Sequence, residues 1–214
     1  MRLKRCYEIA SLRIKQYLEA EIQYVLEYIK PSDVVLELGC GYGRILSRLA
    51  QRAKKVYGID ISEESLRLAR EIFNDMPNVE LHKMNAKSLS FKDHLFDVVI
   101  AIQNSISAFK LDPCELIKES LRVTKHGGKI ILSSYSKNIW EARLDWFIQQ
   151  SKEGLIGEID LKNTRHGEIV CKDGFKATTF TPVEFLNLTS EMKLEAIIEE
   201  VDKSSIFFVI TAYH

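Results

Sequence analysis

Hydrophobic positions along this chain follow two alternating patterns. Short runs that are apolar throughout, or apolar at every second residue, predict strands at residues 34–38, 55–60, 78–84, 96–102 and 129–134. Segments with apolar residues every three or four positions predict helices at 44–50, at 62–73 and from 116 to a cap at Gly127. Repeated strand–helix units predict an α/β fold, in which a doubly wound, mostly parallel sheet carries helices on both faces.

The two ends of the chain depart from this alternation. Apolar residues at helical spacing predict an N-terminal helix within residues 1–30. Near the other end, Thr181 and Glu184 form a capping box that predicts the start of a helix. Two further strands are predicted at 194–198 and 206–210, and the turn between them is so short that they must be antiparallel. We expect residues 1–214 to form a single domain.

Residues 135–180 are too long for a simple connection after the fifth strand. Their first part is rich in aromatic residues at helical spacing, and residues 158–161 and 168–171 flank a turn as in a small hairpin. We interpret this insertion as a cap that covers a pocket, excludes water and shapes a substrate site. A structural elaboration and a dimer contact are the alternatives.

The first predicted strand leads directly into a glycine loop. Glu37 is followed by Gly39, Gly41 and Gly43, and glycine lets the backbone turn tightly and approach a ligand closely. A dinucleotide fingerprint needs a third glycine where this chain has Arg44, and no phosphate-loop Gly-Lys-Ser/Thr triplet follows. The loop therefore predicts a nucleoside-sized ligand other than NAD. A tight turn without a ligand is the alternative.

The second strand ends in Asp60, about twenty residues beyond the glycines. A carboxylate at this place in a doubly wound sheet can accept hydrogen bonds from both ribose hydroxyls of an adenosine. Ser62 follows as the expected N-cap of the next helix. An acid favoured by the dipole of that helix is the other interpretation of Asp60.

The pattern acid-x-Gly-x-Gly-x-Gly resembles the first motif of class I S-adenosylmethionine-dependent methyltransferases, and the resemblance covers roughly residues 31–214. It implies a seven-stranded sheet, S-adenosylmethionine as cofactor and S-adenosylhomocysteine as product. Asn85 stands where many relatives have an aspartate, although an amide oxygen can still accept from the adenine amino group. The cofactor-binding residues that the resemblance implies are Glu37, Gly39, Cys40, Gly41, Gly43, Asp60, Ile61, Asn85, Ala86 and Gln103.

The resemblance also bears on the acceptor. Gln103-Asn104-Ser105 follows the fourth strand and differs from the Asn-Pro-Pro-Tyr tetrapeptide of amino-methylating DNA and protein-glutamine enzymes, which favours a small-molecule acceptor. No catalytic residue is assigned. His166, Tyr135 and Tyr17 are candidates for a general base if the acceptor must lose a proton, although structural roles suit each of them better.

Composition narrows the class of protein further. The formal net charge is zero and no long basic run is present, so nucleic acid is not expected as a partner. The four cysteines form no C-x-x-C pair, which predicts no metal site and suits a reducing cytoplasm. No apolar stretch is long enough to cross a bilayer, so we expect a cytoplasmic protein without membrane contact, as a monomer or homodimer.

Three other functions stay open at this stage. A methyltransferase-like domain can serve as a non-catalytic interaction or regulatory subunit, with the aromatic residues of the insertion as a partner surface. Relatives that transfer an aminopropyl group share the fold, but the acidic cluster expected for a polyamine substrate is not evident here. An oxidoreductase fits the fold class and not the glycine spacing.

Overall fold

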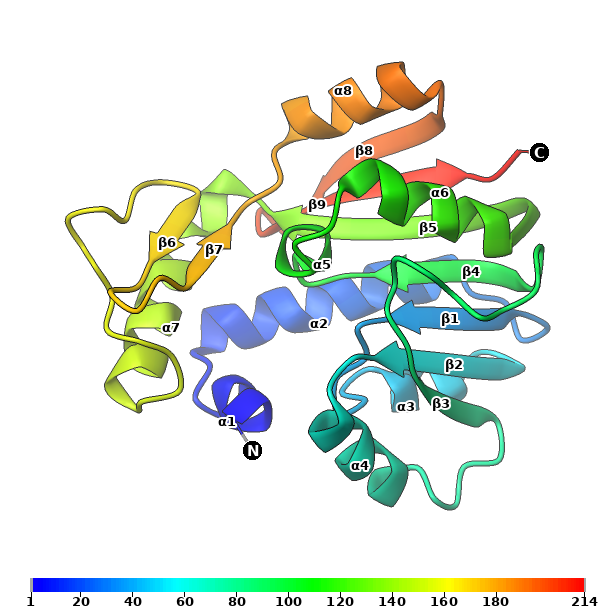
Figure 1. The fold of residues 1–214 in the computed structure, drawn as a ribbon, viewed down its shortest axis with the longest axis horizontal. Coiled ribbons are helices and arrows are strands. Elements are labelled where there is room, and N and C mark those ends of the chain that lie inside the picture. Colours follow the sequence, from blue (N-terminus) through cyan, green and yellow to red (C-terminus); the bar gives the residue numbers. More distant parts are fainter. Residues whose placement is uncertain (1, 214) are drawn as a thin grey trace.

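A seven-stranded sheet forms the centre of the computed structural model, which describes residues 2–213 (Figure 1). Across the sheet the strands are β3 (Val79–Lys83), β2 (Lys55–Asp60), β1 (Val34–Leu38), β4 (Phe96–Ala101), β5 (Thr124–Tyr135), β9 (Ser205–Thr211) and β8 (Glu195–Val201). The first five pair in parallel, whereas β9 is antiparallel to both β5 and β8. The predicted α/β fold, a doubly wound and mostly parallel sheet with a terminal hairpin, is confirmed.

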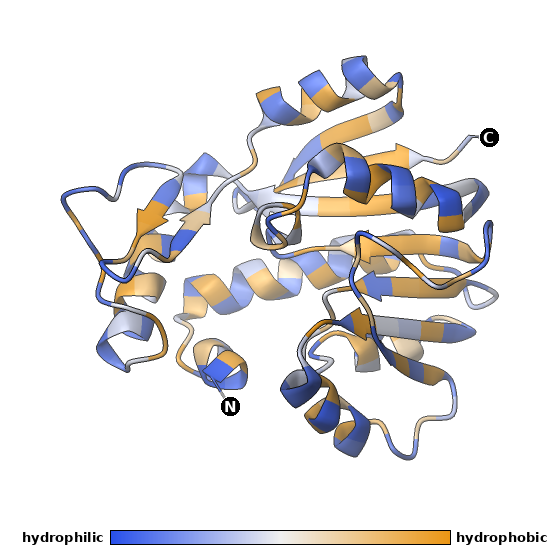
Figure 2. Cartoon of the chain, in the orientation of Figure 1, coloured by the Kyte–Doolittle hydropathy of each residue, from blue (hydrophilic) through white to orange (hydrophobic). Residues whose placement is uncertain are grey.

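Helices cover both faces of this sheet. Successive residues of β4 show why, because Val98 and Ile100 face one hydrophobic cluster while Val99 and Ala101 face the other. The first cluster is closed by α2 (Leu12–Glu27), α3 (Leu46–Ala50) and α4 (Glu63–Ile72). The second is closed by α5 (Ser105–Ala108), α6 (Pro113–Val123) and α8 (Pro182–Met192). Figure 2 shows the apolar residues concentrated on the strands between these layers.

The N-terminal region differs from its prediction. Residues 2–27 hold two helices rather than one, α1 (Arg2–Glu8) and α2, separated at residues 9–11. Ser11 begins the second helix, because its side chain accepts the backbone N–H of Ile14. The apolar period starts only at Ile14, since α1 buries none of its residues fully, and this is why the pattern alone missed the first helix.

The end of α6 is a second correction. Gly127 was expected to cap this helix, but the helix ends at Val123 and β5 begins at Thr124. Gly127 has a φ of 76° inside the strand, close to a register shift between β4 and β5. Its positive φ therefore serves an irregular strand and not a helix terminus.

The insertion after β5 contains η1 (Lys137–Ile139), α7 (Trp140–Lys152) and a small sheet of β6 (Glu168–Val170) and β7 (Lys176–Thr178). The expected contact between residues 158–161 and 168–171 exists as a bridge of Ile159 with Cys171, but β6 pairs mainly with β7. Aromatic residues of the insertion pack with Ile14, Tyr17 and Leu18 of α2 in a third hydrophobic cluster. No helix within residues 2–213 is long and apolar enough to cross a membrane.

Candidate functional site

The glycine loop joins β1 to α3 at the carboxyl edge of the sheet, where β1 lies between β2 and β4. Gly39, Gly41 and Gly43 all have positive φ, at 72°, 56° and 84°. A Cβ on Gly39 would lie 2.6 Å from the ring of Phe109, and one on Gly43 would lie 2.3 Å from the ring of Phe73. Both the backbone conformation and the lack of space therefore require glycine here.

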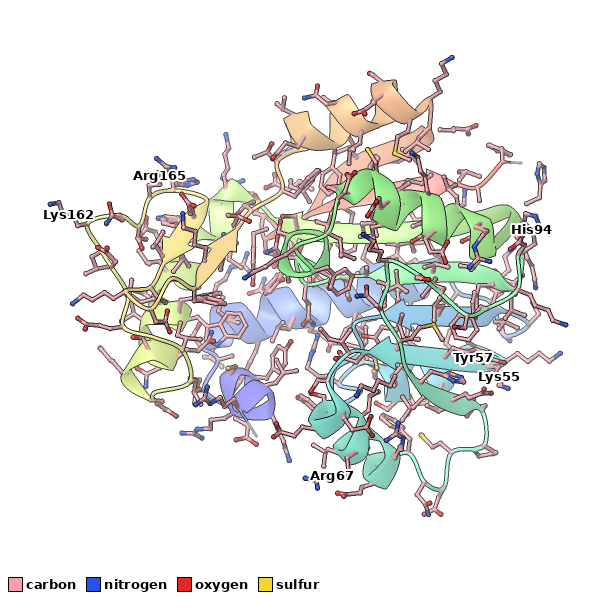
Figure 3. The ribbon with its side chains drawn as sticks, viewed as in Figure 1. Lys55, Tyr57, Arg67, His94, Lys162 and Arg165 are labelled. Atoms are coloured by element: carbon pink, nitrogen blue, oxygen red, sulfur yellow. The ribbon has the colours of Figure 1, made fainter. Side chains whose placement is uncertain are left out.

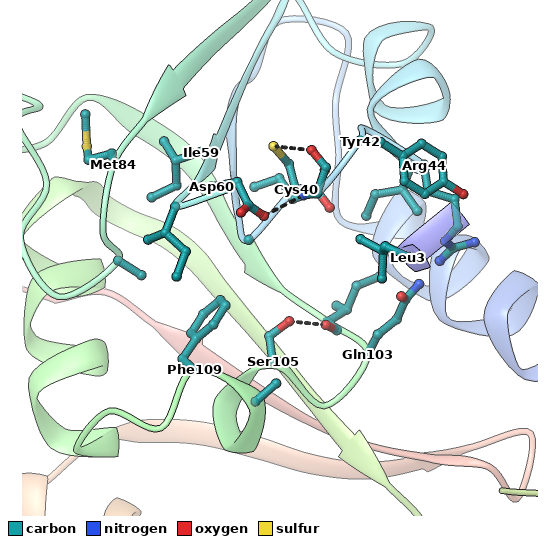
Figure 4. A pocket seen from close by; sticks show the side chains of 18 of the residues that line it. Leu3, Cys40, Tyr42, Arg44, Ile59, Asp60, Met84, Gln103, Ser105 and Phe109 are labelled. Atoms are coloured by element: carbon teal, nitrogen blue, oxygen red, sulfur yellow. Dashed lines mark hydrogen bonds between the residues drawn. The ribbon is translucent and has the colours of Figure 1, made fainter. Parts of the chain in front are cut away.

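A cavity of about 310 Å³ opens over this loop (Figure 4). It lies outside the carboxyl ends of parallel strands at the place where the strand order reverses, which is where doubly wound sheets bind ligands. Most of the predicted site residues line it: Glu37, Gly39, Cys40, Gly41, Asp60, Ile61, Asn85, Ala86 and Gln103. Gly43 does not line the cavity, and its constraint is the contact with Phe73 behind the loop.

Glu37 brings a buried carboxylate to the cavity. Only 7% of the residue is exposed, and its Oε2 atom has no hydrogen-bond partner among the described residues. Burial raises the pKa of Glu37 to about 8, while the Arg44 guanidinium acts in the opposite direction. A buried acceptor without a partner is costly, so the site suits a cationic donor such as an ammonium group.

Asp60 is held in a fixed orientation at the end of β2. Its Oδ2 accepts the Gly41 N–H at 2.8 Å, and its Oδ1 accepts the Ser62 N–H at 2.8 Å. Cys40 adds a second link between loop and strand, because its N–H donates to the Ile59 carbonyl at 2.8 Å. The glycine loop and β2 are thus locked together, and Asp60 keeps lone pairs for further donors.

The apolar part of the cavity lies beyond β2 and β3. Ile61 is 69% exposed, whereas Ala86 is buried, and both side chains line the cavity. The Asn85 side-chain oxygen accepts the Lys87 N–H at 2.9 Å, so this residue forms a local turn. The turn still leaves the amide oxygen a second lone pair for a ligand.

Gln103 occupies a strained backbone position directly after β4. Gln103 and Asn104 have φ values of 59° and 62°, in the left-handed region that residues with a side chain adopt infrequently. The Gln103 N–H donates to Oε2 of buried Glu21 at 3.0 Å and to Oγ of Ser133 at 2.8 Å. These two acceptors from α2 and β5 fix the loop that faces the glycines.

Two neighbours orient the Gln103 side chain. In the amide orientation that satisfies both, its nitrogen donates to the Tyr7 hydroxyl at 2.7 Å and its oxygen accepts from the Arg44 guanidinium. The same guanidinium lies 5.0 Å from the centre of the Tyr7 ring. Residues from α1, the glycine loop and the end of β4 therefore meet at one side of the cavity (Figure 4).

Several lining residues were missed by sequence reasoning. Leu3 and Tyr7 come from α1, and Phe109 follows α5. Leu3 and Tyr7 are four residues apart, so the i,i+4 spacing was a usable signal of a shared helix face. Nothing in the local sequence indicated that this face would cover the glycine loop.

The three candidate bases lie elsewhere. Tyr17 and Tyr135 are buried in the cluster between α2 and the insertion, and the His166 ring stacks on Trp140 with centres 5.0 Å apart. None of them lines the cavity over the glycine loop. Within residues 2–213 we find no group of three or more side chains arranged as metal ligands.

Known proteins share this fold and part of this sequence. Residues 35–128 match the family model described as a methyltransferase domain. The chain is 34% identical to malonyl-[acyl-carrier protein] O-methyltransferase of Marinomonas over 58% of its own length and 47% of the relative's. It is 36% identical to phosphatidylethanolamine N-methyltransferase of Cereibacter sphaeroides over 47% of its own length and 50% of the relative's. The chain thus spans about half the length of these curated relatives.

A solved structure covers much more of the chain. A SAM-dependent methyltransferase from Methanosarcina mazei is 25% identical and superposes with a TM-score of 0.65. The superposition covers 89% of this chain and 98% of the other. The structural similarity therefore extends beyond the region that the family model matches.

Proposed function

Since the chain belongs to the class I S-adenosylmethionine-dependent methyltransferase family, we propose that it transfers a methyl group from S-adenosylmethionine to a small-molecule acceptor. The observation that carries the proposal is the pairing, in one cavity, of the unpartnered Glu37 carboxylate with the glycine loop and Asp60. Such a site would bind three parts of the donor: its ammonium group, the amino-acid portion that lies close to the glycine loop, and its ribose.

Each part of the donor has a matching group in the cavity. Glu37 would accept from the ammonium group, and Gly39 and Gly41 would let the backbone approach the amino-acid portion. Asp60 would accept from the ribose hydroxyls, while Ile61 and Ala86 supply apolar surface for the adenine. Bound S-adenosylmethionine supplies a methyl group on a positively charged sulfur, which is already a good leaving group.

The residues of the chain then act by positioning rather than by activating a nucleophile. Burial raises the pKa of Tyr7 above its ordinary value, so its hydroxyl stays protonated at neutral pH and does not serve as a base. Tyr7, Gln103 and Arg44 form one hydrogen-bonded group beside the glycine loop. Such a group would orient the reactants and exclude water, which accounts for much of the rate in a displacement of this kind.

The acceptor is a finer part of the proposal. The relatives named above carry out O-methylation and N-methylation by their names, so family membership does not select the accepting element. A formal net charge of zero and the Gln103-Asn104-Ser105 sequence after β4 support a small molecule over nucleic acid. We propose a monomer or homodimer, which size-exclusion chromatography with light scattering would distinguish.

Calorimetric titration tests the donor site. The protein is titrated with S-adenosylhomocysteine and, under the same conditions, with NAD. Saturable binding of S-adenosylhomocysteine alone is expected, because Arg44 replaces the third glycine of a dinucleotide fingerprint. Binding of NAD alone, or of neither ligand, would contradict the proposal, and the second result would favour a non-catalytic interaction subunit.

A further inference from the structure

A second, larger hollow lies on the other side of α5 from the donor cavity. Its volume is about 930 Å³, and residues of the insertion, α5, the start of α8 and the terminal hairpin line it. Ser105, Ala108 and Phe109 face the donor cavity, whereas Ile106 and Ser107 face this hollow. The short α5 helix thus forms a wall between two separate spaces, and only Leu111 lines both.

Arg143 of α7 brings a positive charge to this hollow. The residue is 1% exposed, and its Nη atoms donate to the Thr179 hydroxyl at 2.5 Å and the Ala177 carbonyl at 2.8 Å. Its Nε atom is buried without any hydrogen-bond partner among the described residues. No carboxylate of residues 2–213 forms an ion pair with it. All its hydrogen-bond partners are neutral.

Aromatic rings compensate only part of this charge. The guanidinium lies 4.1 Å from the centre of the Tyr135 ring and 5.9 Å from that of Trp140. Burial lowers the pKa of Arg143 from its usual value, yet an arginine side chain remains protonated in proteins. A buried cation without a carboxylate partner is costly, and such a residue is typical of a place where a ligand supplies the anion.

The carboxylates around the hollow are already engaged. Glu168 pairs with Arg165 and Lys176, Glu184 accepts from Thr181, and Glu200 accepts from Asn138. These three acids would repel a dianion such as a phosphate ester, whereas Arg143 can balance a single negative charge; Lys137 is a second basic residue that lines the hollow. Ile106, Leu111, Trp140 and Phe180 give the remaining wall an apolar character.

We propose that this hollow binds an apolar carboxylic acid, whose carboxylate pairs with Arg143 and whose hydrocarbon or aromatic part lies against the wall around Trp140. The site is distinct from the donor cavity and does not require methyl transfer. Asn104 connects the two, because its Nδ2 donates at 2.9 Å to the Thr178 carbonyl, beside the backbone that Arg143 holds.

Calorimetry with matched probes tests this site on the full chain. The probes are decanoate and 4-phenylbutyrate, each compared with its neutral primary amide, in the presence of saturating S-adenosylhomocysteine. At least one acid is expected to bind about tenfold or more tightly than its amide, because a charge-assisted pair with Arg143 is lost in the amide. Equal affinities of acid and amide, no binding of either acid, or competition with S-adenosylhomocysteine would overturn the proposal.

Substitutions test whether Arg143 is the positive charge that pairs with the carboxylate of the probes. Arg143→Met keeps much of the side-chain volume and should abolish the preference for acid over amide, whereas binding of S-adenosylhomocysteine should stay unchanged. Lys162→Met is the matched control, since Lys162 is an exposed cation that projects outward from the same insertion (Figure 3) without lining the hollow, and the variant should leave the preference intact. A preference that survives Arg143→Met would refute the assignment.

Arg143 also supports the backbone of the insertion, so its substitution could disturb the local structure. A second variant therefore keeps Arg143 and changes a residue on another wall of the hollow. Ser107→Trp puts a large side chain on the wall that faces the hollow and should weaken both the acid and the amide about tenfold or more. Unchanged affinity for both probes in this variant would show that they bind elsewhere.

Discussion

Asp60 accepts the backbone N–H of Gly41 at 2.8 Å, although these residues lie on different strand–helix units. The same carboxylate accepts the N–H of Ser62, so it orients the glycine loop and the start of α4 together. The residue proposed to hold the ribose is therefore also the residue that shapes the loop proposed to bind the amino-acid portion of the donor. Its substitution should affect both contacts.

Asp60→Ala should weaken binding of S-adenosylhomocysteine by about tenfold or more, because charge-assisted hydrogen bonds to the ribose are lost. Calorimetry measures the change, and circular dichroism checks the fold. Asp75→Ala, which removes an exposed carboxylate outside the cavity, should bind as the wild type does. Wild-type affinity in Asp60→Ala with an intact fold would show that the ribose site is assigned wrongly.

Glu37→Gln separates the ammonium contact from the ribose contact. The variant should bind S-adenosylhomocysteine about tenfold more weakly, since a neutral amide replaces the carboxylate that faces the ammonium. Methylthioadenosine lacks the amino-acid portion, so its affinity should be unchanged. Asp60→Ala should weaken both ligands, and Glu64→Gln on exposed surface should weaken neither. An equal loss for both ligands in Glu37→Gln would contradict the ammonium role.

The stability of the ligand-free protein should fall as pH rises through the neutral range. Burial raises the pKa of Glu37 to about 8 and that of Glu21 to about 7, from an ordinary value of 4.5. Between those values the folded state holds protons that the unfolded state has released, so the free energy of unfolding decreases with increasing pH.

Thermal melts of Glu37→Gln measure the Glu37 part of this effect. The contribution is complete below about pH 4.5 and is lost as the pH passes about 8, so the variant should lose less stability than the wild type across that window. If the melting temperatures of the two proteins changed with pH in the same way, the folded protein would not raise the pKa of Glu37.

Two glycine substitutions separate backbone strain from steric conflict. Gly154 has a φ of 66°, and a Cβ at this position would meet only open space, so Gly154→Ala should cost only about 1 kcal/mol. Gly43→Ala adds a contact of 2.3 Å with the buried Phe73 ring and should cost about 1–3 kcal/mol more. Urea unfolding measures both. Equal losses would mean that Phe73 moves aside freely.

Local sequence was enough to predict much of this molecule. Short stretches of neighbouring residues predict the strand–helix alternation, the terminal hairpin, the glycine loop and Asp60. This is possible because hydrophobic period, helix capping and positive φ are local properties of the chain. The antiparallel direction of β8 and β9 also follows from a short connection alone. These features fix the sheet and, through it, the edge at which the cavity opens.

Only the tertiary structure decided what surrounds that edge. The approach of Tyr7 to Gln103 and the placement of Phe109 against Gly39 depend on packing between distant segments. Arg143 reads in the sequence as an ordinary helix residue, and only the fold buries it without a carboxylate. Long-range contacts of this kind leave no periodic signal, because they depend on where the elements pack and not on the order of neighbouring residues.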